Sequence, residues 1–176
     1  MSDPFVVAFV PGVTPGKWSR IWEDRMRRQP LELRPLDQAA ALTALRDGTV
    51  RMALVRDVDA DDELHVIPLY REQPVVVVPK DHPVTAFESV ALSDLGGETL
   101  LDGQGADTVE LVAANVGLAI MPQSVARAHS RRDVAARPLT DVPDTGIGLA
   151  WLQTDDDPRI QAFVGIVRGR TINSSR

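Results

Sequence analysis

The sequence predicts an α/β fold with two lobes. Its clearest element is the run of four valines at 75–78, which is followed by Pro79. Because this run has no polar face, it is typical of a strand that is covered on both sides, and a proline cannot donate a hydrogen bond to a neighbouring strand, so the strand ends there. Strand and helix patterns alternate before this run and again after it. That order is typical of two lobes joined by a crossover strand, and a cleft between lobes is a common place for a small ligand.

The amino-acid composition is that of a globular protein that can bury a hydrophobic core. The 176 residues are 44% hydrophobic, and the formal net charge is -6, which argues against nucleic-acid binding by this chain. There is no cysteine, so disulfides, thiol nucleophiles and thiolate metal sites are excluded. No apolar run is long enough to span a membrane and no signal-peptide pattern occurs. We therefore expect a cytoplasmic protein without a membrane partner.

Residues 5–10 and 14–26 predict the first strand and the first helix. The run 5–10 is apolar throughout, as in a buried strand. Thr14 is a suitable N-cap, and Pro15 suits the first helical position, where its missing N–H costs no hydrogen bond. Apolar side chains then recur at helical spacing and are expected to pack on the sheet as core. They are Trp18, Ile21, Trp22 and Met26.

The alternation continues through the first lobe. A second strand near 31–35 precedes a helix at 38–46, for which Asp37 is the predicted N-cap. A third apolar strand at 52–55 ends at Arg56.

The remaining elements follow from the same signals. Strands are expected at 66–70, 75–78, 98–101, 118–121, 134–139 and 147–152, and helical segments at 92–95, 107–114, 122–129 and 158–168. Asp107 and Asp157 are the predicted caps of two of these helices. Asn115 occupies a position that requires a left-handed backbone, for which Asn is the best residue after Gly.

Side chains that could carry catalysis or hold a metal are scarce. The histidines, His65, His82 and His129, have no metal-ligand spacing with one another or with a carboxylate. The sequence contains no nucleophile elbow and no phosphate-binding loop. The acidic segment 57–63 lacks the glycine and the spacing of a calcium loop, so a solvated loop is the simpler interpretation. We expect no enzyme activity, no cofactor and no metal.

A binding site is better supported by the residues. Thr14, Pro15 and Gly16 place a hydroxyl and unpaired helix N–H groups at the end of the first strand, and a helix start favours anions and carboxylates. Ligands in open α/β sheets bind at such strand ends. Asp37 and Arg56 are predicted at the same edge. The sequence leaves open the alternative that Thr14 and Asp37 are only caps and that Arg56 is only a surface charge.

Four stretches together form a recognisable pattern. They are LTALRDG at 42–48 running into MALV at 52–55, VVVPKDHP at 76–83, VELVAANVGLAIMPQS at 109–124, and 145–151. In order and spacing they resemble the effector-binding (substrate-binding) domain of LysR-type transcriptional regulators. The resemblance implies two Rossmann-like lobes, as in type 2 periplasmic binding proteins, joined by two crossover strands. It also implies a small-molecule effector in the cleft and a homodimer.

The chain departs from this family pattern in three places. The family's N-terminal winged helix-turn-helix and linker helix do not precede the first strand, so we expect a domain without its own DNA-binding element, either excised or stand-alone. Leu101 leads almost at once to Asp107, where family members usually place a helix and a strand, so the second lobe is expected to be shortened. Asn115 stands where the family usually has Gly.

The resemblance, taken with the residues, gives one set of expected contacts. The candidate effector-binding residues are Thr14, Pro15, Gly16, Asp37, Arg56, Gly103, Met121 and Pro122. The dimer implied by the resemblance sets 31–46 of one chain against 122–129 of the other. The small side chains of Ala39, Ala40 and Ala41 permit close approach of the helices, although a stripe that faces the core would also explain them.

The positions of the predicted strands and helices also set the expected boundaries of the two lobes. Lobe one is expected at 1–78, the reduced lobe two at 79–139, a return to lobe one at 140–170 and a tail at 171–176. The leading hypothesis is a sensor of a small, anionic metabolite in transcription regulation. Its rivals are a stand-alone protein-interaction module that pairs with a full-length regulator or another partner, and an enzyme on the same architecture, since a fold alone does not decide function.

Overall fold

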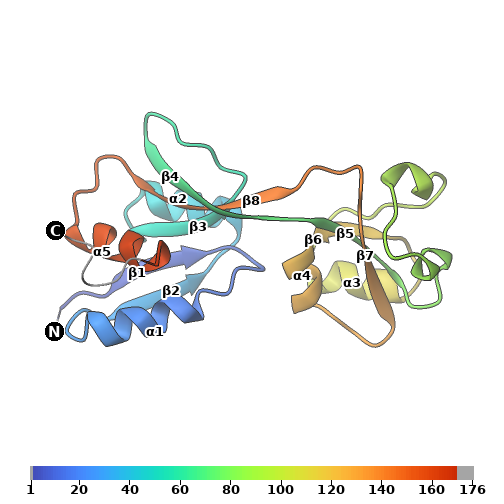
Figure 1. The fold of residues 1–176 in the computed structure, drawn as a ribbon, viewed down its shortest axis with the longest axis horizontal. Helices are drawn as coiled ribbons and strands as arrows, with labels where there is room; N and C mark the ends of the chain where they lie inside the picture. The colour runs from blue at the N-terminus through green and yellow to red at the C-terminus, as the bar shows by residue number, and fades with distance from the viewer. Residues whose placement is uncertain (1, 170–176) are drawn as a thin grey trace. The chain divides into compact units, whose positions relative to one another are not determined.

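The chain forms two compact units in the computed structural model, which describes residues 2–169 (Figure 1). Unit 1 holds Met1–Leu69 and Ile147–Arg176, and unit 2 holds Tyr70–Gly146. Strands β4 (Leu64–Glu72) and β8 (Thr145–Leu152) carry the chain from one unit to the other. The predicted tail at 171–176 lies outside the described residues.

Unit 1 is built on a sheet of strand order β2-β1-β3-β8-β4. Strand β1 (Phe5–Phe9) runs parallel to β2 (Leu31–Pro35) and to β3 (Met52–Arg56), and β3 pairs antiparallel with β8. The apolar runs predicted as strands are therefore strands, and all three parallel strands end at one edge of the sheet.

The helices of unit 1 cover both faces of this sheet. They are α1 (Gly16–Arg25), α2 (Gln38–Arg46) and α5 (Pro158–Val167). The ring of Phe5 stacks on Trp22 of α1 at 5.1 Å and meets Phe163 of α5 at 6.1 Å. Right-handed crossovers with this strand order place α1 and α2 on opposite faces. The prediction that Trp18 and Trp22 are core residues is confirmed, since they are 6% and 0% exposed.

Unit 2 is built around β5 (Pro74–Pro79), the central strand of the order β6-β5-β7. Both neighbours, β6 (Ala119–Pro122) and β7 (Val134–Pro138), run antiparallel to it. Val75 and Val77 pack with α3 (Ala106–Ala113) and α4 (Gln123–Ala128). Val76 and Val78 pack on the other face with the 3-10 turns Pro83–Ala86 and Leu92–Leu95. The prediction that this strand is covered on both sides is confirmed.

The position of β5 corrects the predicted lobe boundaries. A boundary at 78/79 would leave β5 in lobe one, but its hydrogen-bonded neighbours are β6 and β7, so the second unit begins at Tyr70. Residues 140–146, predicted to return to lobe one, also belong to unit 2.

Two smaller predictions are wrong. Residues 98–101 form only a single bridge, between Leu100 and Leu118, instead of a strand. The N-cap of helix α3 is Gly105, two residues before the predicted cap Asp107, and no side chain caps the helix, while the Asp107 carboxylate accepts from the N–H of Thr108 at 2.9 Å. Asn115 has the predicted left-handed backbone, with φ 60°.

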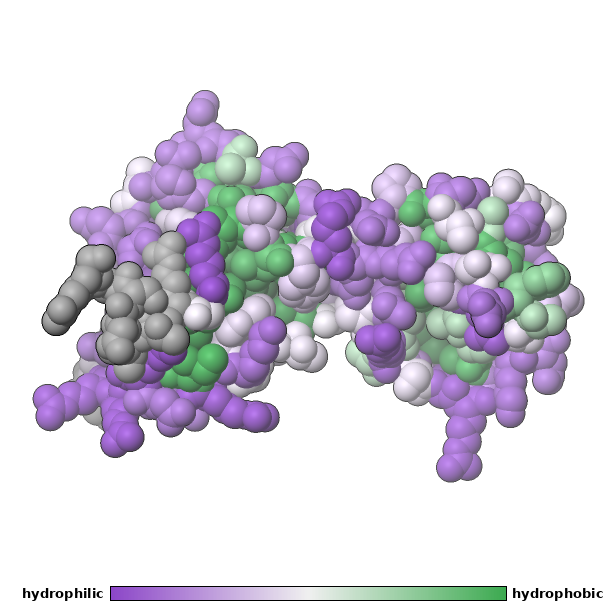
Figure 2. All heavy atoms as spheres, in the orientation of Figure 1, coloured by the Kyte–Doolittle hydropathy of each residue, from purple (hydrophilic) through white to green (hydrophobic). Residues whose placement is uncertain are grey.

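The surface differs between the units in its large apolar side chains. On the face in Figure 2, hydrophilic residues cover most of both units, with hydrophobic ones between them. The large hydrophobic residues that are exposed within 2–169 all lie in unit 2. They are Tyr70, Phe87, Leu92, Leu100, Leu111 and Val116. Every helix within 2–169 is too short or too polar to cross a membrane.

An ion-pair cluster ties the start of α5 to the sheet of unit 1. Asp157 caps α5 by accepting from the N–H of Arg159 at 2.9 Å, and its carboxylate also pairs with the Arg159 guanidinium at 2.7 Å. Arg159 in turn donates to the carbonyl of Asp3 at 2.9 Å and lies 5.3 Å from the ring of Phe5. The hydrogen bond from the Arg159 side chain lowers the pKa of Asp157 despite its partial burial.

The Asp157 cluster predicts a pH-dependent stability. A carboxyl whose pKa is lowered on folding stabilises the fold above its unfolded pKa, about 3.9, and loses that contribution as pH falls through the folded pKa. Asp157→Asn keeps a capping side chain but loses the charge, so we expect a loss of about 1 kcal/mol at pH 7 that shrinks below about pH 4. Urea unfolding at a series of pH values measures it. Asp156→Asn at the exposed neighbour is the control, and an equal loss at both ends of the pH range would contradict the assignment.

Candidate functional site

The strand ends of β1 and β3 form one edge of the unit 1 sheet, and the starts of α1 and α2 face it. After Phe9 the chain leaves the sheet at Val10, whose N–H still donates to the carbonyl of Leu54 at 3.1 Å. Gly12 then turns the chain with φ 90°, a backbone that glycine adopts without steric cost. This turn brings the chain back toward α1.

The start of α1 differs from the predicted capping arrangement. Pro15, not Thr14, holds the N-cap position, and no side chain caps the helix. The Pro15 carbonyl accepts from the N–H groups of Trp18 and Ser19, at 3.0 and 3.1 Å. Within residues 2–169, the N–H groups of Gly16 and Lys17 thus have no acceptor. Thr14, Gly16 and Lys17 are exposed and Pro15 is buried.

The start of α2 is fixed to the end of β3. Asp37 is the N-cap, as predicted, and accepts from the N–H of Ala40 at 2.8 Å. The side-chain amide of Gln38 accepts from the Arg56 N–H at 2.9 Å and donates to the Arg56 carbonyl. Gln38 therefore occupies both backbone groups of Arg56, as a neighbouring strand would.

Arg56 also links the two strand ends. Its guanidinium donates to the carbonyl of Pro11 at 3.2 Å. The structure thus brings Arg56, the turn after β1 and the start of α2 together, and the Arg56 side chain has a structural contact at this edge.

Lys17 adds a positive charge at this edge of the unit 1 sheet. Its ammonium lies 4.9 Å from the ring centre of Trp18, which places a cation beside the first turn of α1. Helix N–H groups, a nearby ammonium and the Thr14 hydroxyl are all groups that bind a negatively charged oxygen. No cluster of His, Asp and Glu suited to a metal ion occurs among the described residues.

The predicted site residues of unit 2 are placed less favourably. Met121 is 1% exposed and belongs to the core beneath α3 and α4, so its side chain has no access to a ligand. Pro122 is buried opposite Pro74 in the β5–β6 pair. Gly103 lies in an exposed loop with φ 108°, where any side chain would come within 2.5 Å of the Thr108 hydroxyl.

Sequence reasoning missed two contributors to the site in unit 1. Gln38 follows the N-cap directly, so a polar first helical residue at a strand edge was a weak local signal. Its partner Arg56 is 18 residues away, and no spacing rule predicts that bond. Lys17 was visible as a cation in the first turn of a helix, a place where cations are ordinarily disfavoured.

Solved structures of known proteins share this fold over nearly the whole chain. A mutant regulatory domain of OxyR from Pseudomonas aeruginosa matches with a TM-score of 0.77 and 20% identity, covering 98% of this chain and 100% of that one. The effector-binding domain of a BenM variant matches with a TM-score of 0.81 and 18% identity, covering 97% and 98%. The BenM effector-binding domain with its effector benzoate matches with a TM-score of 0.79 and 19% identity, covering 94% and 90%.

These likenesses define the class of fold, that of two-unit effector-binding domains similar to type 2 periplasmic binding proteins. The sequence model of the family described as LysR substrate binding domain matches residues 17–108 and 103–171 of this chain. The chain belongs to this family. A curated relative, the uncharacterized HTH-type transcriptional regulator YybE of Bacillus subtilis (strain 168), is 30% identical over 162 residues, which cover 75% of this chain and 49% of the relative. The chain thus spans about half the length of the curated relative it matches.

The Gln38 bridge predicts a local effect on strand β3. Gln38→Leu removes both bonds to Arg56 and leaves its backbone groups without partners, so we expect a loss of about 1–3 kcal/mol and faster hydrogen exchange of the Arg56 amide. Native-state exchange by NMR measures both. Gln161→Leu, at an exposed position of α5, is the matched control. Unchanged exchange at Arg56 in Gln38→Leu would show that the bridge does not hold the strand end.

Proposed function

We propose that this chain is the effector-sensing domain of a LysR-type transcriptional regulator and that it binds a small, anionic metabolite at the carboxyl edge of the unit 1 sheet. The observation that carries the proposal is the start of α1, where the N–H groups of Gly16 and Lys17 have no acceptor within 2–169 and the Thr14 hydroxyl is exposed. Family membership supports a sensing role. We assign the chain no catalytic step and place it in the cytoplasm.

The chemistry at this edge favours an anion. An anionic oxygen at the start of α1 would receive hydrogen bonds from backbone N–H groups that already point along the helix axis, and it would gain from the helix dipole and from the Lys17 ammonium. A neutral ligand would gain only the hydrogen bonds. The BenM domain with benzoate, itself a carboxylate, is consistent with such a ligand.

We assign no DNA recognition to this chain itself. Its formal net charge is -6, whereas DNA-binding domains use clusters of Lys and Arg to displace the counterions of the phosphates. The proposed role is to bind the metabolite and pass that signal to the part of the regulator that reads DNA.

The effector proposal is tested with Thr14→Val and Lys17→Glu. Because Thr14 does not cap α1, Thr14→Val should leave the free energy of unfolding unchanged within about 0.5 kcal/mol while removing a ligand contact. A thermal-shift screen of small carboxylates finds a ligand, and calorimetry measures its Kd. We expect the Kd to rise several-fold in Thr14→Val and at least tenfold in Lys17→Glu, where a repelling charge replaces an attracting one.

Arg20→Glu is the control for charge, since Arg20 is exposed on α1 but lies one turn beyond its start. It should bind as the wild-type chain does. A ligand whose affinity is the same in Thr14→Val, Lys17→Glu and Arg20→Glu would place the effector site elsewhere.

We also propose a homodimer in which 31–46 of one chain lies against 122–129 of the other, as the family resemblance implies. The structure corrects one part of that hypothesis: Ala41 is fully buried in the core of unit 1, so it cannot face a partner. Ala39 of the same segment is exposed, and so is Thr43 one turn further along α2.

The dimer is tested by Thr43→Arg. A stable pair buries on the order of 1,200–2,000 Å², so a long charged side chain at its centre should shift the chain to monomer without unfolding it. Light scattering at a protein concentration above the dimer Kd measures the mass. The control is Gln161→Arg, an exposed position on α5. A wild-type chain that is already monomeric would overturn the dimer and favour a module that pairs with a different regulator.

A further inference from the structure

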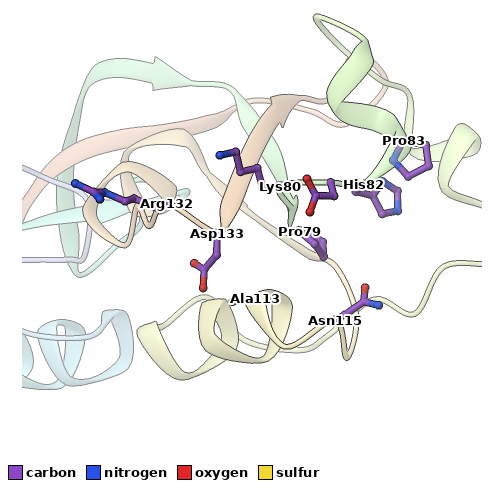
Figure 3. Close-up of a pocket in the computed structure, with 9 residues that line it drawn as sticks. Pro79, Lys80, His82, Pro83, Ala113, Asn115, Arg132 and Asp133 are labelled. Atoms are coloured by element: carbon purple, nitrogen blue, oxygen red, sulfur yellow. The ribbon is translucent and has the colours of Figure 1, made fainter.

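A concave site lies within unit 2, where β5 ends and β7 begins. The cavity measures about 650 Å³, in the range of small-molecule sites. Its wall is fixed by the backbone: the N–H of Lys80 donates to the carbonyl of Asp133 at 3.0 Å, and Pro79 pairs with Val134 across the two strands. The end of α3 closes the other side with Ala113 and the left-handed Asn115 (Figure 3).

Two cations of this cavity have no partner. Lys80 and Arg132 are exposed, and neither side chain forms an ion pair or hydrogen bond within 2–169. Figure 3 shows the two side chains apart from one another, with that of Arg132 extending away from the other labelled residues. Unpaired cations in the lining of one concave site favour a ligand with a negatively charged group.

The carboxylates at the cavity do not cancel these cations. Asp133 is already engaged by two hydrogen bonds from Arg131, both at 2.9 Å, and these bonds lower the pKa of Asp133. Asp81 is the other acidic residue of the lining. With Asp133 paired to Arg131, two cations face one carboxylate.

The remaining wall is apolar or held in place by hydrogen bonds. Pro79, Pro83 and Ala113 present non-polar surface. His82 accepts from the N–H of Val84 through Nδ1 at 3.2 Å, and its Nε2 lies 2.9 Å from the Glu98 carboxylate. These two bonds hold the ring in place as part of the wall.

We infer that this cavity binds an organic carboxylate with a small non-polar body, the carboxylate on Lys80 and Arg132 and the body against Pro79, Pro83 and Ala113. Every lining residue belongs to unit 2, so this site is separate from the effector site proposed at α1 and stands whether or not that site binds a ligand. A domain with two such sites would respond to two small molecules.

The test is a titration of the full chain with phenylacetate and with hexanoate, in which binding is monitored by the amide chemical shifts in NMR spectra. Inorganic phosphate is the comparison ligand, since it carries negative charge but has no non-polar part. We expect saturable shifts at 80–83, 113–116 and 131–133 at carboxylate concentrations up to about 10 mM, tenfold above a millimolar Kd. In the double variant Lys80→Ala/Arg132→Ala the Kd should rise at least tenfold.

The matched control is Arg20→Ala/Arg127→Ala, which removes the same charge from exposed arginines outside the cavity. It should bind the carboxylates as the wild-type chain does. The proposal is overturned if neither carboxylate shifts these amides, if the double variant at the cavity binds as tightly as the control, or if phosphate binds while the carboxylates do not.

Discussion

Unit 2 depends on the strand β5, which has no polar face. Four consecutive valines, each at most 3% exposed, must be covered on both sides, because leaving either face in water would expose apolar surface worth roughly 25 cal/mol per Å². The two layers that result are α3 with α4, and the segment of 3-10 turns between Pro83 and Leu95. The same strand must stop at Pro79, since proline cannot continue a hydrogen-bonded ladder. The cavity of unit 2 is formed where that strand stops.

Unit 1 is governed by a different constraint, the common edge at which its parallel strands end. Backbone groups at such an edge have lost their strand neighbours and need other partners. The Gln38 side chain is the hydrogen-bond partner of the Arg56 backbone N–H and carbonyl, and the Arg56 guanidinium is the partner of the Pro11 carbonyl. In the first turn of α1, the N–H groups of Gly16 and Lys17 have no acceptor within residues 2–169. Open N–H donors at a helix start are suited to binding an acceptor from solution, which is the basis of the proposed effector site.

Local signals in the sequence predicted the elements well, and failed where two local arrangements compete. Helix α2 has the predicted bounds because Asp37 is a strong cap, and α5 begins with the predicted pair Asp157 and Pro158. At α1, two positions compete for the helix start: Thr14 was predicted as the N-cap, but the helix begins at Gly16, with Pro15 at the N-cap position and no side-chain cap. The site itself was predicted only in part: the edge followed from strand order, but the Gln38–Arg56 bridge and the Lys80–Arg132 cavity join residues 18 and 52 positions apart. Such pairs depend on tertiary packing and leave no periodic signal.

The central claim is that a small carboxylate binds at the start of α1 and the strand ends beside it. Hydrogen–deuterium exchange of the full chain, with and without a carboxylate found by thermal shift, tests it most directly because each peptide segment reports separately. The account predicts that bound ligand slows exchange at 12–18 and 36–40, since the N–H groups of Gly16 and Lys17 gain an acceptor and the edge around them is held more tightly. Slower exchange confined to unit 2, or no change at 12–18 at saturating ligand, would contradict it.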